Sequence, residues 1–292
     1  MKTRTGRFPI GFRRGRGWQD NTTDLADWAG GVGFEAVDLG EATAEDIRVL
    51  RDHGLRVGTC DLLSMALLLS PDEGERKEAV RRNIDYFKKL TGLGIDHFFT
   101  AVIPKDPGRS RSDNYSLALA TLDELAHAAA DLGAMIVIEG WPGVFPYYAN
   151  LCCTPETCRR ILAEVNSPGL GVNYDPSHLI RMGIDHIRFL EEFAGRVGHV
   201  HAKDAEILGE AIYEYGITQT SVFEPQFYCG ENYWRYTIPG HGQARWLKAF
   251  QILEKAGWEG IVSVELEDQS FHGSSEAEKL GLACSLAFLQ TV

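Results

Sequence analysis

Four stretches of the sequence share one pattern, a short apolar run that ends on a charged or metal-ligating side chain. They read AMIVIE (Ala134–Glu139), LGVNYD (Leu170–Asp175), VGHVH (Val197–His201) and IVSVE (Ile261–Glu265). Short runs that are apolar at nearly every position are typical of strands buried on both faces, as in a parallel sheet. The pattern therefore predicts four parallel strands with polar final residues.

Outward from these stretches, the rest of the chain predicts four earlier strands, with helices between the strands and after the last one. The earlier strands are expected over residues 8–12, 36–39, 56–62 and 97–103. The helices are expected over residues 24–33, 43–54, 73–94, 114–133, 154–165, 185–193, 243–257 and 275–289. Two of them begin with the spacing of a capping box, Thr43 with Asp46 and Ser275 with Glu278.

Eight strand–helix units in 292 residues fit a closed (β/α)8 TIM barrel of the α/β class. We expect residues 1–292 to form this single domain. An open, doubly wound sheet is the alternative, but the sequence lacks its glycine-rich nucleotide fingerprints.

The charge balance argues against polyanionic partners. Lys and Arg number 29 and Asp and Glu number 41, which gives a net charge of −12. Such a chain repels nucleic acids and anionic membranes. The longest mostly apolar run, Leu62–Leu69, is far shorter than the ~20 residues that span a bilayer. The six cysteines show no CxxC pair and are expected to be reduced, and we expect a soluble, cytoplasmic protein.

The polar strand ends predict a metal site. In a closed barrel the C-terminal ends of the strands form one rim, where active sites lie. Glu139, Asp175, His201 and Glu265 are therefore expected to converge there. Three carboxylates packed together repel one another unless a cation binds between them. An oxygen-rich set with one nitrogen suits a single Mn, Mg or Co ion, with Zn or Fe as alternatives.

Further polar residues lie near the same rim. His178 follows Asp175 by three residues and is expected to contact substrate or a second metal ion. Lys203 shares a strand face with His201 and is expected either to bind a substrate oxygen or to pair with Asp204. His199 lies on that face too, deeper in the barrel, and is interpreted as a core histidine.

The segments IEG (138–140), NYDPSH (173–178), HVHAKD (199–204) and SVELED (263–268) resemble the xylose-isomerase-like TIM-barrel superfamily. Within it, they are most similar to the bacterial sugar phosphate isomerase/epimerase family, as is WRYTIPGHG (234–242). The resemblance covers nearly the whole chain. It implies one divalent metal ion bound by Glu139, Asp175, His201 and Glu265, with His178 facing the substrate.

The chain departs from some members of the superfamily. Ketohexose 3-epimerases carry a substrate-binding Glu and Arg where this chain has Phe145 and Ile207, which argues against free ketohexoses as substrates. DNA-repair endonucleases with three zinc ions need histidines at earlier strand ends. Those ends read Cys60-Asp61 and Ala101-Val102 here, which argues against a trinuclear site.

The expected activity is isomerisation or epimerisation of a sugar, keto-sugar or cyclic polyol. A proton is removed beside a carbonyl, and the resulting ene-diolate is bound by the metal. Glu139 and Glu265 are expected to remove and return the proton. The substrate-binding candidates are His178, Lys203, Trp141 and Trp234.

The alternative keeps the site and changes the outcome. The same deprotonation can expel a group from the β-carbon, which makes the enzyme a lyase. Related barrels of this kind, including C-glycoside deglycosidases, cleave an aglycone from a 3-oxo-glycoside and work with a small second subunit. A barrel without catalytic activity is disfavoured because all four ligand positions are filled. A homo-oligomer acting on a small carbohydrate is expected.

The connection at residues 204–238 is the longest in the predicted barrel. A loop of this length without evident secondary structure is usually functional or disordered. Its dense aromatic residues must be buried somewhere, which disfavours disorder. We expect this inserted loop to close over the metal site as a lid, or to form a subunit interface.

Overall fold

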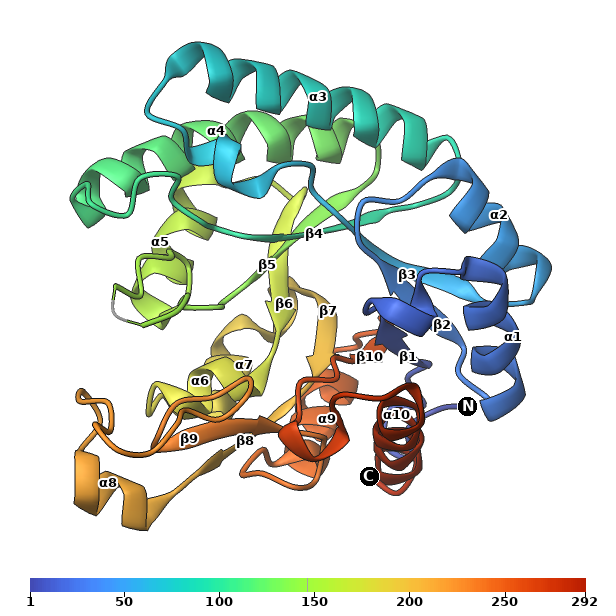
Figure 1. Ribbon diagram of the computed structural model, residues 1–292. Helices are drawn as coiled ribbons and strands as arrows, with labels where there is room; N and C mark the ends of the chain where they lie inside the picture. The colour runs from blue at the N-terminus through green and yellow to red at the C-terminus, as the bar shows by residue number, and fades with distance from the viewer. Residues whose placement is uncertain (146) are drawn as a thin grey trace.

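The computed structural model describes residues 1–145 and 147–292 and contains a closed barrel of parallel strands (Figure 1). The order around the barrel is β1-β10-β7-β6-β5-β4-β3-β2. The strands are β1 (Ile10–Arg13), β2 (Ala36–Leu39), β3 (Arg56–Asp61), β4 (His97–Ala101), β5 (Met135–Glu139), β6 (Leu170–Tyr174), β7 (Val197–Ala202) and β10 (Val262–Val264). This arrangement confirms the predicted TIM barrel.

Helices surround the barrel and cover the outward faces of its strands (Figure 1). They are α1 (Thr22–Val32), α2 (Ala44–Asp52), α3 (Glu73–Thr91), α4 (Arg111–Asp131), α5 (Pro155–Val165), α7 (His186–Phe193), α9 (Trp246–Lys255) and α10 (Ser275–Leu289). Their amphipathic faces pack on fully buried strand residues such as Ile10, Phe98 and Ile136. Burial of these apolar faces holds the helices to the barrel.

The structure bears out one predicted capping box and shifts the other by one residue. The Thr43 side chain accepts from the Asp46 amide, and the Asp46 carboxylate accepts from the Thr43 amide. At α10 the cap is Ser274, whose hydroxyl accepts from the amide of Ala277. Either Ser274 or Ser275 could have served as the N-cap of α10, and in the structure the cap is Ser274.

Two differences from the sequence-based prediction change the rim of the barrel. The first strand begins at Ile10 and ends at Arg13, so Arg13 reaches the C-terminal edge. A short helix, α6 (Pro176–Arg181), begins directly after β6, with Asp175 as its N-cap. The prediction contained no helix here. Proline at the first position of α6 is typical of helix starts and was the available signal.

The segment at 204–238 has regular structure, contrary to the expectation of a loop without it. Strands β8 (Asp204–Ile207) and β9 (Trp234–Thr237) form an antiparallel ribbon, and α8 (Gly209–Tyr215) follows β8. This ribbon projects from the lower left of the barrel in Figure 1. The role of the segment as a lid or an interface stays a prediction.

The aromatic residues of this segment are not all buried. Trp234 and Tyr236 of β9 are buried, with 3% and 4% exposure. Tyr213 and Phe223 are 84% and 92% exposed, which is contrary to the expectation that the aromatic residues bury. The segment therefore has a buried base beside the barrel and an exposed tip.

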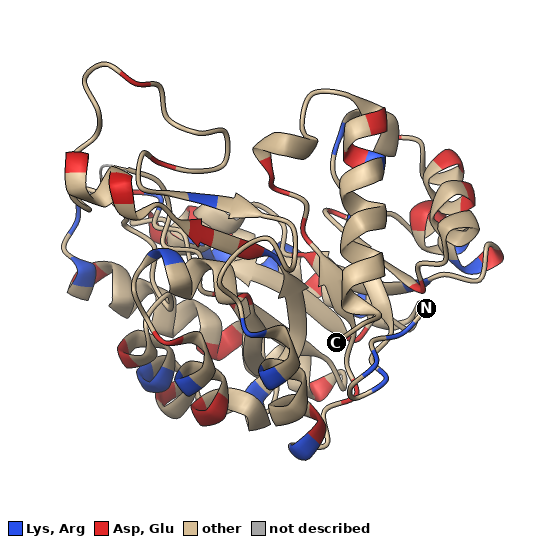
Figure 2. Cartoon of the chain, turned by 90° about the horizontal axis from the view of Figure 1, so that it is seen from below, with Lys and Arg blue, Asp and Glu red and all other residues tan. Residues whose placement is uncertain are grey.

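Surface and compositional features agree with a water-exposed exterior. Acidic and basic positions are interspersed along the outer helices (Figure 2). Within the described residues, no helix combines the length and the apolar character needed to cross a membrane. All six cysteines are unpaired, as the sequence predicts.

The carboxylate of Asp204 fixes the base of the ribbon. Oδ1 accepts hydrogen bonds from the amides of Ala205 and Ala244, at 2.9 and 2.8 Å. Oδ2 accepts from the amide of Gly240 and from Nε1 of Trp246, both at 3.1 Å. One buried side chain thus connects β8, the turn after β9 and the start of α9.

Asp204→Ala should destabilise the fold by about 3 kcal/mol, because four donors lose a charged acceptor inside the protein. The measurement is the free energy of unfolding from urea titration. The matched control is Glu206→Ala on the same strand, which removes a partly exposed ion pair with Arg235 and should cost at most about 1 kcal/mol. Equal losses in the two variants would show that Asp204 does not fix the ribbon.

Candidate metal centre

The four predicted ligand residues all lie at the C-terminal rim of the barrel. Glu139 is the last residue of β5, and Asp175 directly follows β6. His201 lies one residue before the end of β7, and Glu265 directly follows β10. Because β5, β6, β7 and β10 are consecutive around the barrel, their final residues occupy one arc of the rim.

The structure brings a carboxylate and imidazole cluster together at this arc. Glu139, Asp175, His178 and Glu265 each offer one ligand atom, and these atoms all lie within 4.8 Å of one another. His178 Nε2 lies 3.4 Å from both Glu139 Oε2 and Asp175 Oδ2. His178 is therefore part of the cluster, at a position that the sequence placed only on the same rim.

His201 contacts the same cluster from the side of β7. Its Nδ1 lies 2.7 Å from Glu139 Oε1 and 3.5 Å from Glu265 Oε2. Its ring stacks on Phe99 with the centroids 5.1 Å apart. Three of the four predicted ligands thus share the compact set with His178, whereas His201 groups with Asp38 and His199 and reaches that set only through its contacts with Glu139 and Glu265.

The electrostatics of the cluster favour a cation. Burial raises the pKa of Asp175, and the nearby charges of His178 and Lys203 offset this only in part. Burial also opposes ionisation of Glu139, but His201 and His178 outweigh it and hold its pKa well below the ordinary value. Like charges at this spacing repel each other and need a positive partner.

Two buried atoms fit a ligand at this cluster, Asp175 Oδ2 a bound metal ion and His178 Nε2 a substrate atom beside it. Asp175 Oδ2 and His178 Nε2 have no hydrogen-bond partner within the described residues, although both point into the cluster. A buried polar atom without a partner costs free energy, so such atoms mark places where a ligand or ion completes the site. The oxygen-rich donor set with imidazole nitrogen suits a divalent cation.

Lys203 lies inside the cluster and does not pair with Asp204. Its ammonium contacts Glu265 Oε2 at 2.5 Å, Glu267 Oε2 at 2.9 Å and Asp175 Oδ2 at 3.4 Å. It also lies 4.5 Å from the ring centre of Tyr236. Asp204 is already saturated by its four donors, which explains why the expected pair does not form.

Arg13 is a site residue that the sequence analysis missed. Its guanidinium makes a bidentate ion pair with Asp61, at 2.9 and 2.7 Å, and lies 3.4 Å from Glu265 Oε1. It also covers the ring of Phe99 at 4.5 Å. The available signal was an arginine directly after an apolar run, which the predicted strand boundary at residue 12 left outside the strand.

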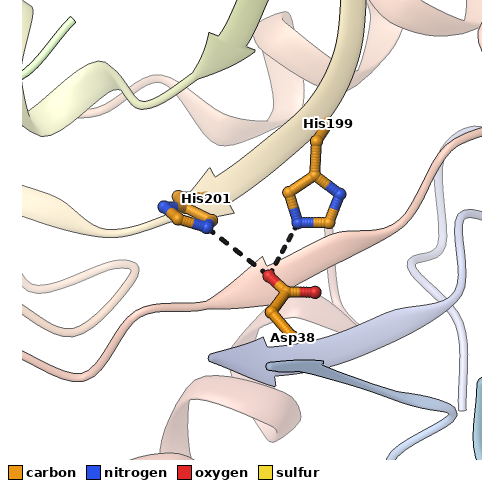
Figure 3. Close-up of side chains that lie close together, drawn as sticks. All are labelled: Asp38, His199 and His201. Atoms are coloured by element: carbon orange, nitrogen blue, oxygen red, sulfur yellow. Dashed lines mark hydrogen bonds and ion pairs between the residues drawn. The ribbon is translucent and has the colours of Figure 1, made fainter. Parts of the chain in front are cut away.

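Asp38 and His199 form a second buried layer below the cluster. Oδ2 of Asp38 accepts from His199 Nε2 at 2.8 Å and lies 3.4 Å from His201 Nε2 (Figure 3). Burial disfavours the charge on Asp38, but the two imidazoles outweigh this and hold its pKa below the ordinary value. His199 is buried as expected of a core histidine, and Asp38 was missed because it lies inside a strand.

Two cavities reach the carboxylates from outside. One of about 350 Å³ is lined by Trp141, Trp234, Tyr236 and Glu267, among others. Another of about 480 Å³ is lined by Arg13, Glu265 and Glu267. Glu267 borders both cavities, and its carboxylate contacts the buried ammonium of Lys203 at 2.9 Å. The predicted substrate-binding residues Trp141 and Trp234 thus line a space next to the cluster.

Comparisons with known proteins agree with this architecture. A family model described as xylose isomerase-like TIM barrel matches residues 25–291. An inosose dehydratase of Geobacillus thermodenitrificans (strain NG80-2) is 24% identical over 251 residues, which cover 81% of this chain and 78% of that protein. The uncharacterized protein YfiH of Bacillus subtilis (strain 168) is 35% identical over 125 residues, which cover 42% of this chain and 38% of that protein.

Solved structures with the same fold include two epimerases. The 3-keto-D-glucoside 4-epimerase YcjR from E. coli matches with a TM-score of 0.70 at 16% identity, over 98% of this chain and all of that one. A D-psicose 3-epimerase from Clostridium cellulolyticum H10, solved with D-tagatose, matches with a TM-score of 0.68 at 15% identity, over 97% of this chain and 98% of that one. At these identities the likeness establishes the fold.

We expect the purified protein to bind one divalent ion per chain, and Glu265→Gln to lose most of that binding because a neutral amide is a poorer ligand. The measurement is metal content by elemental analysis after dialysis against Mn²⁺. Glu267→Gln is the matched control, because Glu267 also contacts Lys203 but is neither one of the four predicted ligands nor part of the compact set that includes His178. Equal metal content in Glu265→Gln and wild type would contradict the predicted ligand set.

Proposed function

The chain belongs to the xylose isomerase-like TIM barrel family, and from this premise we propose that it is a metal-dependent sugar isomerase or epimerase. The substrate is a keto-sugar or a cyclic polyol ketone, and the reaction begins with removal of a proton beside the carbonyl. The observation that carries the proposal is the set of buried Glu139, Asp175 and His178 with half-buried Glu265, and the unpartnered polar atoms of Asp175 and His178.

The residues proposed to hold the metal ion are Glu139, Asp175, His201 and Glu265. Mn, Mg and Co suit this donor set best, with Zn and Fe as alternatives. When bound, a divalent ion supplies Lewis acidity that makes a C–H bond beside a carbonyl easier to deprotonate. The protein's own part is to hold three anionic carboxylates together in a buried place.

Glu139 and Glu265 are the proposed acid and base. They stand on strands β5 and β10, which are separated in the barrel by β6 and β7. They therefore approach a substrate between them from two sides, and one can take the proton while the other returns it. A carboxylate is ionised at neutral pH and can accept the proton, and when protonated it can return it.

Lys203 and the tryptophans are the proposed substrate contacts. The buried ammonium of Lys203 contacts Glu267, which lines both cavities, and can donate to a substrate oxygen bound at the cluster. Trp141 and Trp234 line the smaller cavity. Trp141 is half-buried and offers a flat apolar surface for a sugar ring, whereas Trp234 is 3% exposed and carries the Arg181 guanidinium over its ring, so it shapes the cavity wall. Phe145 also lines this cavity, in the place of the acidic residue that ketohexose 3-epimerases carry.

A lyase is the second candidate, and the relatives named dehydratase offer an analogy for the loss of water but none for the release of an aglycone. The name inosose dehydratase denotes loss of water, and the alignment with that enzyme covers 81% of this chain. Loss of water or of an aglycone from the β-carbon starts with the same deprotonation. The same residues would therefore serve, and only the leaving group would differ.

Incubation of the purified protein with keto-sugars, inososes and 3-oxo-glycosides in D₂O tests the proposal. An isomerase or epimerase should place deuterium on the carbon beside the carbonyl while the substrate keeps all its oxygens. A lyase should release water or the aglycone and form an unsaturated product. Absence of exchange and of turnover with every substrate, in protein shown to contain metal, would contradict the proposed function.

His178 is proposed to act on the substrate, since its imidazole lies at the cluster and its Nδ1 is held by the Tyr236 hydroxyl at 2.6 Å. His178→Ala should lower kcat/KM at least about tenfold, which is ~1.4 kcal/mol, with metal content unchanged. Steady-state kinetics and elemental analysis on the same preparation measure both. Loss of the metal from His178→Ala would instead make His178 a ligand, and unchanged kinetics would make it structural.

A further inference from the structure

Asp38 is a carboxylate in the interior of the barrel, where an apolar side chain would serve the fold as well. It lies within β2, below the rim, and its side chain is fully buried. Burying a carboxylate in a barrel interior is costly unless its partners use the charge. The partners here are the imidazoles of His199 and His201, one of which is a proposed metal ligand (Figure 3).

The neighbouring strand makes room for this carboxylate. A Cβ atom at Gly58 would lie 1.9 Å from Asp38 Oδ1, so a larger residue at position 58 would push the carboxylate aside. The pairing of β2 with β3 also shifts register between Val37 and Leu39, beside Asp38. The backbone is thus shaped around the side chain.

His201 is held between two sets of carboxylates. Its Nδ1 faces Glu139 and Glu265, while its Nε2 faces Asp38. The stack on Phe99 restricts rotation of the ring. A neutral imidazole carries one proton, and an ionised carboxylate can only accept a hydrogen bond. In the structure Nδ1 lies 2.7 Å from the carboxylate of Glu139 and therefore carries a proton there, whereas Nε2 makes no hydrogen bond within the described residues and lies 3.4 Å from Asp38 Oδ2. A divalent ion that binds Nδ1 displaces that proton, and the proton that remains on the ring is the one on Nε2, which faces Asp38.

We propose that Asp38 is a positioning residue that keeps the proton of His201 on Nε2 and so presents Nδ1 to the divalent ion. This inference rests on the proposed function, because it assumes that His201 is a ligand. Carboxylates that accept from the second nitrogen of a metal-bound histidine typically contribute 10- to 100-fold in metal affinity. His199 supports the arrangement by donating to the same oxygen of Asp38.

The principal test compares metal binding by the metal-free wild type, Asp38→Asn and a matched control. An asparagine keeps the shape, but its amide can donate to Nε2 and then favours the proton on Nδ1. The control is Ser263→Ala, a buried side chain at the position of β10 that pairs with His201. Titration with Mn²⁺ should give a Kd 10- to 100-fold weaker for Asp38→Asn and within about twofold of wild type for Ser263→Ala.

A second measurement needs no variant at position 38, so it holds even if Asp38→Asn does not fold. Long-range ¹H–¹⁵N NMR of Mg²⁺- or Zn²⁺-loaded protein with labelled histidine reports which ring nitrogen carries the proton. The signal of His201 is assigned by its loss in His201→Gln. A proton on Nε2 supports the proposal, whereas a proton on Nδ1 overturns it.

The metal titration separates failure of this inference from failure of the proposed function. Equal Kd values for wild type and Asp38→Asn overturn this inference and leave the proposed function standing. Two ions per wild-type chain and one in Asp38→Asn would make Asp38, His199 and His201 a second metal site, which also overturns it. If the wild type binds none of the divalent ions tested, the metal-dependent function fails and this inference fails with it.

Discussion

Repulsion among buried carboxylates is the constraint around which the rim of this barrel is organised. Three carboxylates lie close together in a largely buried site, those of Glu139, Asp175 and Glu265. Positively charged side chains of the same chain lie in contact with them. Lys203 contacts Asp175 and Glu265, and Arg13 adds a contact to the far oxygen of Glu265. Ionic partners that stay paired in a buried site hold their geometry better than flexible surface charges do.

The sequence predicted the parts of the site that follow from chain periodicity. The C-terminal end of each apolar run lies at the rim of the barrel. Glu139, Asp175 and Glu265 could therefore be identified from their own strands alone. Arg13 required the exact strand boundary, which local patterns give poorly. Asp38 required knowledge of which barrel strands face each other across the interior, and Tyr236 required knowledge that the ribbon packs beside His178; no single segment contains that information.

The connection after β7 shows the same limit on a larger scale. Its pairing of β8 with β9 joins residues about thirty positions apart, from Asp204 to Thr237, across a stretch without strong periodicity. What fixes the pairing is tertiary, chiefly the acceptor role of Asp204 towards backbone groups beyond β9 and towards Trp246. The number of aromatic residues could not separate the buried Trp234 from the exposed Phe223, because the sequence around each is polar and has no strong periodicity.

Because Gly58 lies so close to Asp38, the residues that positions 38 and 58 can accept depend on each other. A side chain gained at position 58 takes the space of the carboxylate, and once the carboxylate is lost, the neighbour that still limits position 58 is His199, whose Cε1 would lie 3.2 Å from a Cβ there. Substitutions at these positions are therefore epistatic, and their order matters along any evolutionary path. A lineage that has lost the acidic residue can accept a small side chain at position 58 if His199 shifts slightly, whereas a lineage that retains it is held to glycine.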